Sequence, residues 1–242
     1  MEPGTDQGWP RAVIFDFYGT LARWQVSHVS NYISVFAEHG YHLPDTVLDE
    51  YFARYDGVDH AEHSVSEDMY ELWVRMRLRD LTAACAVAPH ECDGIIEALR
   101  VSDTGPMCTY PEVEATLRTL RERGIAIGVC SNWGWHLDPY LADLALLDLV
   151  DSAVTSARAG ARKPHPSIYT RAAAELGVAP HEAIFVGDSW VPDVEGPRRL
   201  GMTAIHVWRP EERQGQTPPN LVEGASRIGD LGQVLDVLSA VG

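Results

Sequence analysis

Six polar residues in this chain carry groups that could do chemistry, and each lies at or soon after the end of a short apolar segment. They are three aspartates, a lysine, a serine and an asparagine: Asp16, Ser131, Asn132, Lys163, Asp188 and Asp193. Carboxylates that lie within a few ångströms of one another repel unless a cation separates them. Because Mg²⁺ prefers carboxylate, carbonyl and water oxygens, a fold that brings these residues together would create a magnesium site. It would also place a lysine beside a carboxylate that can attack an electrophile.

The segments before these residues have the pattern of buried strands. Ala12 to Phe15 is an apolar run that ends at Asp16, and Ile125 to Cys130 ends at Ser131. Further strands are predicted at Ala153–Thr155, Ala183–Val186 and Thr203–Trp208. Strands that alternate with helices at this spacing indicate an α/β fold with a doubly wound parallel sheet. Ligands of such sheets bind beyond the carboxyl ends of the strands, where we expect the polar residues to gather.

The segment from about 24 to 105 has a helical pattern and contains no convincing strand. Apolar residues recur there at three- and four-residue spacing after Ser66, a residue type that caps helices. An insertion of roughly 85 residues is long enough for a small helical domain. We therefore predict an α/β core domain of residues 1–22 and 106–242, and a helical domain of residues 23–105. The acids and histidines of the stretch 59–63 have irregular spacing, so we interpret them as solvated rather than as metal ligands.

The composition argues against several classes of protein. A formal net charge of -16 opposes binding to nucleic acids and to anionic membranes. No segment reaches the ~18 apolar residues of a membrane span, and the acidic N-terminus is unlike a secretory signal. The four cysteines form no C-x-x-C pair. We therefore expect a cytoplasmic protein, a monomer or a homodimer, whose partner is a small molecule and neither a nucleic acid nor a membrane.

Four short motifs, taken in order, resemble those of the haloacid dehalogenase superfamily. The first covers residues 16–21 (DFYGTL) after an apolar strand, and the second covers 131–132 (SN). The third covers 163–169 (KPHPSIY), and the fourth covers 187–189 (GDS) with Asp193. With their strands they span residues 12 to 208, nearly the whole chain. The resemblance implies a Rossmann-like core with a helical cap domain and a hydrolase with an aspartate nucleophile.

The resemblance also implies a role for each motif residue. Asp16 would be the nucleophile, and Lys163 would balance the charge that develops on the substrate. The catalytic residues would be Asp16, Tyr18, Ser131 and Lys163. The magnesium ligands would be Asp16, the backbone carbonyl of Tyr18, Asp188 and Asp193. The residues that bind the substrate's phosphoryl group would be Thr20, Ser131, Asn132 and Lys163.

Two motif positions depart from the superfamily in opposite directions. Phosphatases usually carry a second aspartate two residues after the nucleophile, as the general acid, whereas this chain has Tyr18. A tyrosine there resembles the L-2-haloacid dehalogenases, whose halide leaves without a proton. A phenol with a pKa near 10 is also a poor base for activating water at neutral pH. However, those metal-free dehalogenases resemble one another in having serine and asparagine where this chain has Asp188 and Trp190.

Three functions are therefore open. The favoured one is a Mg²⁺-dependent phosphatase of a small phosphorylated metabolite, in which Asp16 forms an aspartyl-phosphate. The alternative is an (S)-2-haloacid dehalogenase, in which Asp16 attacks the carbon that carries the halogen. The third is a catalytically weak member that binds a phosphorylated ligand or a protein partner. The chain departs from the dehalogenase pattern at two positions, Asp188 and Trp190, and from the phosphatase pattern at one, Tyr18. This balance favours the phosphatase.

Overall fold

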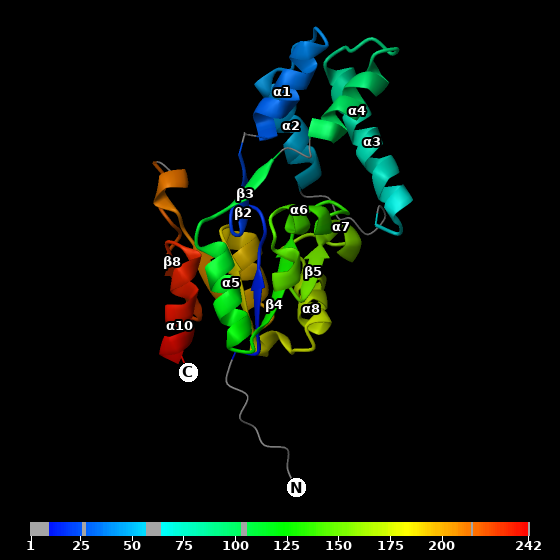
Figure 1. Cartoon of the computed structure of the whole chain (residues 1–242). Helices are drawn as coiled ribbons and strands as arrows, with labels where there is room; N and C mark the ends of the chain where they lie inside the picture. The colour runs from blue at the N-terminus through cyan, green and yellow to red at the C-terminus, as the bar shows by residue number, and fades with distance from the viewer. Residues whose placement is uncertain (1–9, 26–27, 57–63, 103–105, 214, 242) are drawn as a thin grey trace. The chain divides into compact units, whose positions relative to one another are not determined.

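The computed structural model describes residues 10–25, 28–56, 64–102, 106–213 and 215–241 (Figure 1). By the contacts between its residues, the chain divides into two compact units. The core unit comprises Met1–Arg23 and Thr109–Gly242, and the helical unit comprises Trp24–Cys108. The stretch 59–63, interpreted above as solvated, lies outside the described residues.

The core unit is built on a six-stranded parallel sheet in the order β5-β4-β1-β6-β7-β8. In that order the strands are Ser152–Thr155, Ala126–Ser131, Ala12–Phe15, Ala183–Gly187, Thr203–Val207 and Ala225–Ile228. The central strand β1 pairs in parallel with β4 on one side and β6 on the other. All four of its residues are fully buried, which explains its uninterrupted apolar sequence. The predicted α/β fold with a parallel sheet is confirmed.

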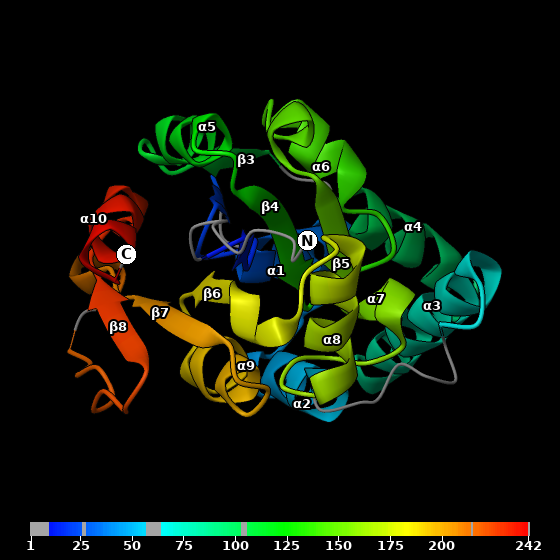
Figure 2. The ribbon, with the colours of Figure 1, turned by 90° about the horizontal axis from the view of Figure 1, so that it is seen from below.

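Helices cover both faces of this sheet. Helices α5 (Val113–Glu122) and α10 (Val234–Val241) lie on one face, and α8 (Pro166–Glu175) and α9 (Gly196–Arg198) lie on the other (Figure 2). Helix α8 contributes Ile168, Tyr169, Ala172 and Ala173 to a buried apolar cluster that also includes residues of β1 and β6. The shorter helical segments are α6 (Asp138–Asp143), η1 (Leu147–Leu149), α7 (Ser156–Ala159), η2 (Pro180–Glu182), η3 (Trp190–Glu195), η4 (Pro210–Glu212) and η5 (Leu231–Gln233).

Two elements of the core unit differ from the expectation. Strand β8 was not predicted, because its sequence Ala-Ser-Arg-Ile is not an apolar run and it exists by pairing with β7. The helix expected at Asp193–Leu200 is instead a π-helix, η3, followed by the short α9. Pro197 lies inside α9 and has no N–H to donate, so a regular helix is interrupted there.

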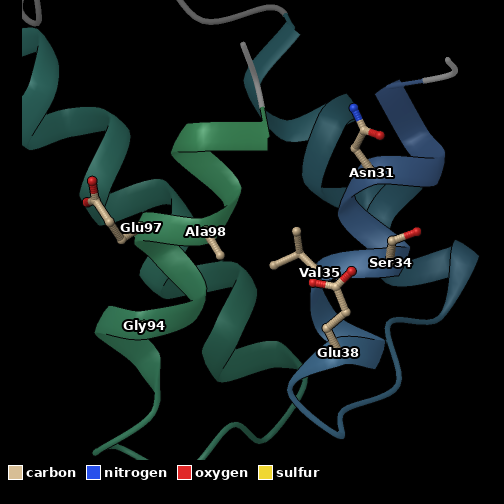
Figure 3. A pocket seen from close by; sticks show the side chains of 7 residues that line it. All are labelled: Asn31, Ser34, Val35, Glu38, Gly94, Glu97 and Ala98. Carbon is tan, nitrogen blue, oxygen red and sulfur yellow. The ribbon is translucent and has the colours of Figure 1, made fainter. Parts of the chain in front are cut away.

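The helical unit contains α1 (His28–Glu38), α2 (Asp45–Asp56), α3 (Glu67–Ala84) and α4 (Cys92–Ser102). Ser66 caps α3 as predicted, because its side chain accepts a hydrogen bond from the Met69 N–H. The interior is apolar, and Phe36 and Ile95 are fully buried in it. A groove with a volume of about 520 Å³ lies between α1 and α4, where Gly94 leaves open space (Figure 3).

Two short strands occur where the chain passes between the units. They are β2 (Ala22–Trp24) and β3 (Met107–Thr109), which pair in a separate two-stranded sheet. Neither was expected from the sequence, since three residues are too few for a recognisable alternation. Within the described ranges, no helix has both the length and the apolar character needed to cross a membrane.

Candidate active site

Asp16 lies directly after β1, at the carboxyl edge of the sheet. Its side chain is almost completely buried, and its N–H donates to the Val186 carbonyl at 2.8 Å. The carboxylate oxygen Oδ1 accepts from the Ser131 hydroxyl at 2.9 Å and from the Lys163 ammonium at 2.7 Å. The order of the strands explains this arrangement, because β4, which ends in Ser131, is the direct neighbour of β1. The carboxylate is therefore held in one orientation by two donors.

Lys163 connects two of the aspartates. Its ammonium donates to Asp16 Oδ1 and to Asp193 Oδ1, both at 2.7 Å, and its side chain is only 2% exposed. Burial opposes the charge of this ammonium, but Asp16 and Asp193 together hold the Lys163 pKa above its usual value. The lysine is thus a permanent cation in an otherwise acidic protein.

The Asn132 side chain holds the backbone of Lys163. Its carbonyl oxygen accepts from the Lys163 N–H at 2.7 Å, and its amide nitrogen donates to the Lys163 carbonyl at 3.1 Å. This pair of bonds fixes the point from which the lysine side chain extends. The sequence predicted Asn132 as a substrate-binding residue, and in this structure its side chain positions the lysine.

Three carboxylates meet at this edge of the sheet. Asp16, Asp188 and Asp193 each offer an oxygen, and these oxygens all lie within 4.8 Å of one another. Burial, together with the charge of Asp16, raises the pKa of Asp188 to about 6, although Arg213 opposes the shift. Burial also raises the pKa of Asp193 against the opposing effect of Lys163. The carboxylates therefore repel one another, and a divalent cation would relieve that repulsion.

Two glycines allow the acidic groups to come this close. Gly19 has φ 81°, and a Cβ at this position would lie 2.9 Å from the Asp188 carboxyl carbon. A Cβ at Gly187 would lie 2.4 Å from the carboxyl carbon of Asp193. Any side chain at either position would push an aspartate away from the cluster. A set of hard carboxylate oxygens packed in this way would suit a divalent cation such as Mg²⁺.

Arg213 and His206 also act on Asp188, and the sequence did not point to either. The Arg213 guanidinium donates to Asp188 Oδ2 at 2.5 Å and to the Asp188 carbonyl at 2.9 Å. His206 contacts the same carbonyl through Nε2 at 3.1 Å. Arg227 donates to His206 Nδ1, so the ring proton is on Nε2 and the histidine is the donor to Asp188.

Arg209 fixes the turn that follows the nucleophile. This guanidinium is nearly buried and donates to the carbonyls of Gly19 and Thr20, at 3.0 Å and 3.3 Å. It also pairs with Glu112 at 2.8 Å, and it lies 3.6 Å from the centre of the Tyr110 ring. No motif identifies Arg209, because its partners lie about 190 and 97 positions away in sequence.

Tyr18 and Thr20 were predicted as site residues, but neither side chain takes part in the hydrogen bonds described above for the other site residues. The Tyr18 side chain is exposed over about half of its surface. Burial of the remainder, and the charges of Asp188 and Glu212, raise the Tyr18 pKa, so the phenol stays protonated. Thr20 is fully buried, and its hydroxyl has no hydrogen-bond partner among the described residues. A substrate oxygen would reach that hydroxyl only after a movement of the residues around it.

Comparisons with known proteins agree on one family. A family model described as haloacid dehalogenase-like hydrolase matches residues 10–201. The Homo sapiens protein named haloacid dehalogenase-like hydrolase domain-containing protein 3 is 30% identical over 214 residues, which are 83% of this chain and 83% of that protein. A phosphoserine phosphatase of Thermus thermophilus is 36% identical over 129 residues, which are 52% of this chain and 49% of that protein.

A solved structure extends the likeness to the fold. The 2-haloacid dehalogenase of Pseudomonas syringae pv. tomato DC3000 superposes with a TM-score of 0.71. The match covers 96% of this chain and 99% of that chain, at 23% sequence identity. At that identity the likeness shows the fold alone and does not choose between hydrolysis at phosphorus and at carbon.

Proposed function

Since this chain belongs to the haloacid dehalogenase-like hydrolases, we propose that it is a Mg²⁺-dependent phosphatase of a small phosphorylated molecule. The observation that carries the proposal is the cluster of Asp16, Asp188 and Asp193, whose oxygens lie within 4.8 Å of one another. Phosphoryl transfer uses a divalent cation to neutralise charge on the transferred group. A haloacid would instead meet Asp188 as a repelling charge beside its own carboxylate. The partial match to a phosphoserine phosphatase supports the same choice.

In this proposal Asp16 attacks phosphorus and forms an aspartyl-phosphate. Ser131 and Lys163 hold Oδ1, which fixes the direction of the carboxylate before the substrate binds. The Lys163 ammonium also stabilises the negative charge that develops on the phosphoryl oxygens. The charge is already in place and needs no reorganisation, because Asp193 and the Asn132 side chain hold the lysine.

Asp16, the Tyr18 carbonyl, Asp188 and Asp193 would hold the Mg²⁺. When bound, this cation supplies Lewis-acid stabilisation of the phosphoryl group. Outside the cluster, Arg213 and His206 hold the Asp188 backbone carbonyl. They keep Asp188 in place beside Gly19 and the nucleophile.

A 2-haloacid dehalogenase is the second candidate, and Tyr18 is the observation that favours it. A halide leaves carbon without a proton, so a protonated phenol at this position would cost such an enzyme nothing. The convergence of three carboxylates argues against it, since the attack of Asp16 on a haloacid needs no metal.

Assays of both reactions would decide between the two candidates. We expect the protein to release phosphate from 4-nitrophenyl phosphate in Mg²⁺, and to lose this activity in excess chelator. We expect no halide release from 2-chloropropionate under either condition. Halide release that chelator leaves unchanged would establish the dehalogenase instead.

Two variants test the assigned residues. Asp16→Asn should lose several powers of ten in rate while the fold is unchanged, because the amide is not a nucleophile. Asp188→Ala should lose Mg²⁺ binding in calorimetry together with activity. Retention of full Mg²⁺ affinity by Asp188→Ala would refute the metal site.

A further inference from the structure

The backbone carbonyls of the turn after the nucleophile are held by hydrogen bonds, with one exception. In residues 17–22, the carbonyls that accept a hydrogen bond are those of Phe17, Gly19, Thr20, Leu21 and Ala22. Within the described part of the chain, no group donates to the Tyr18 carbonyl. Backbone carbonyl oxygens are among the hard ligands that Mg²⁺ accepts. The carbonyl that these hydrogen bonds leave out is therefore the one expected among the magnesium ligands.

Arg209 supplies two of these hydrogen bonds from a distant part of the sequence. Its Nη1 donates to the Gly19 carbonyl at 3.0 Å, and its Nη2 donates to the Thr20 carbonyl at 3.3 Å. The other carbonyls of the turn accept from backbone N–H groups. Arg209 is only 4% exposed, so water competes little for its donors. One guanidinium therefore fixes the two carbonyls that directly follow Tyr18.

The guanidinium is itself anchored by other elements of the core unit. Glu112, which directly precedes α5, accepts from Arg209 at 2.8 Å and from the Leu231 N–H of η5 at 3.3 Å. The Arg209 guanidinium also lies 3.6 Å from the centre of the Tyr110 ring. Because the Glu112 carboxylate balances its charge, the pair as a whole does not repel a cation nearby. A planar guanidinium can serve two carbonyls and a carboxylate at once, whereas an ammonium is a compact point charge.

The position of the turn also sets its distance from Asp188. A Cβ at Gly19 would lie 2.9 Å from the Asp188 carboxyl carbon, so the turn and this carboxylate are in close contact. Arg209 follows β7, and Asp188 follows β6, which is the neighbour of β7 in the sheet. Arg209 therefore ties the Gly19 carbonyl to the edge of the sheet that carries Asp188. A shift of the turn would move the Tyr18 carbonyl relative to the Asp188 carboxylate.

We propose, on the basis of the metal-dependent phosphatase function proposed above, that Arg209 is a positioning residue for Mg²⁺ binding. It holds the carbonyls of Gly19 and Thr20, which leaves the Tyr18 carbonyl free to bind the cation and keeps the turn against Asp188. Arg209 acts on the backbone of the turn and not on the substrate. Its effect on the reaction therefore comes through the affinity of the site for the metal.

Calorimetry of Mg²⁺ binding to the whole protein tests this role without a substrate. Arg209→Lys keeps the positive charge beside Glu112 and removes the planar fork. We expect its Mg²⁺ dissociation constant to rise about 10- to 100-fold, the usual effect of losing a group that supports metal ligands. Arg121→Lys is the matched control, because Arg121 also donates to a carbonyl and a carboxylate, those of Leu149 and Asp151. Neither of these partners belongs to the site, so the control should bind Mg²⁺ as tightly as the wild type.

Two further measurements separate a positioning role from a purely structural one. With 4-nitrophenyl phosphate, Arg209→Lys should lose activity at low Mg²⁺ and recover most of it at saturating Mg²⁺, where KM should be close to the wild-type value. Urea unfolding in chelator measures the stability of the same variant without metal. A purely structural role would lower the free energy of unfolding and leave the Mg²⁺ dissociation constant of the folded protein unchanged. Activity that saturating Mg²⁺ does not restore would also contradict the inference.

The double variant Arg209→Met/Glu112→Leu takes the place of the lysine variant if that protein does not fold. Replacing both members of a buried ion pair by apolar side chains is often neutral for stability, and it leaves the local net charge unchanged. The double variant should therefore fold and bind Mg²⁺ about 10-fold or more weakly than the wild type. Wild-type Mg²⁺ affinity in either folded variant would overturn the inference and leave the proposed function intact. A wild-type protein that binds no Mg²⁺ would instead refute the proposed metal site itself.

Discussion

Among the described residues, the buried charged side chains, which include Lys163, Asp193 and Arg209, all belong to the core unit. The Lys163 and Asp193 side chains, paired at the carboxyl edge of the sheet, are 2% and 1% exposed. The Arg79 and Asp93 side chains, paired between α3 and α4, are 65% and 76% exposed. A buried pair costs desolvation energy that its attraction often fails to return, whereas a surface pair contributes little either way. The buried pair of Lys163 and Asp193 therefore coincides with the candidate active site, where a charge that costs stability could serve catalysis.

The interiors of the two units differ in the same way, because, of the residues that the structure describes, only those of the core unit add buried charged groups to an apolar interior. The helical unit is held by an apolar cluster in which Phe36, Leu81 and Ile95 are almost completely buried. The core unit has an apolar interior as well, and it adds buried polar groups at the sheet edge, including Lys163 and Arg209. We expect charge substitutions to be severe in the core unit and mild in the helical unit, and the predictions below test that contrast.

Lys163→Met should produce the largest loss of stability. The change leaves Asp16 and Asp193 buried without their cation, which typically costs about 3–5 kcal/mol. Urea unfolding in the presence of chelator would measure the change. The double variant Lys163→Met/Asp193→Leu is the control, because removing both charges should restore part of the lost stability. A loss below ~1 kcal/mol in the single variant would be no larger than the loss of a surface ion pair. It would contradict the expected difference between the two units.

Leu81→Ala should destabilise the helical unit by about 2–5 kcal/mol, through lost burial and the cavity left behind. Leu81 is 1% exposed in the apolar cluster. Met76→Ala in the same helix is the matched control, since Met76 is 58% exposed. Amide hydrogen exchange in α3 would report both changes. Equal protection in the two variants would show that the apolar cluster is not what holds this unit.

His206 should make the stability of the core unit depend on pH. Burial lowers the His206 pKa from 6.5 to about 4, and the effect of burial outweighs the hydrogen bond to Asp188 that raises it. The folded protein therefore binds fewer protons than the unfolded chain between these values. The stability contributed by neutral His206 is complete above pH 6.5 and is lost as the pH falls towards 4.

Unfolding measurements in chelator across this range would show the effect. One proton gives a slope of at most about 1.4 kcal/mol per pH unit. His206→Gln keeps a donor for the Asp188 carbonyl and removes the titrating ring. The slope of stability against pH should therefore be less positive in the variant than in the wild type, where the raised pKa values of Asp188 and Asp193 oppose the effect of His206. Identical slopes in the two proteins would mean that other groups cause the dependence.

Arg79→Ala should have the smallest effect. Its partner Asp93 lies at 2.9 Å, but both side chains are solvated, so the pair should contribute less than ~1 kcal/mol. A double-mutant cycle with Asp93→Ala would isolate the interaction from the loss of each side chain. A coupling energy comparable to the cost of Lys163→Met would contradict the contrast between the units.

The sequence by itself determined the residues that stand at the ends of β1, β4 and β6. A strand buried on both faces is a short apolar run, and the first polar residue after it lies at the carboxyl edge. Asp16, Ser131 and Asp188 were predicted to converge for this reason, and the structure brings Asp16 within hydrogen-bond distance of Ser131 and into a cluster with Asp188. The first motif also includes Gly19, whose φ of 81° lets the chain turn after the nucleophile.

The tertiary structure decided which distant residues support that site. Arg209 reaches the Gly19 carbonyl, and Arg213 reaches Asp188, because β7 lies beside β6 in the sheet. The order of the strands is a property of the whole sheet, and neither arginine lies in an apolar run or a motif. Strand β8 likewise depends on its hydrogen bonds to β7 rather than on its own composition. Local sequence specifies burial and backbone preference, whereas ion pairs between remote segments exist only once the sheet has been assembled.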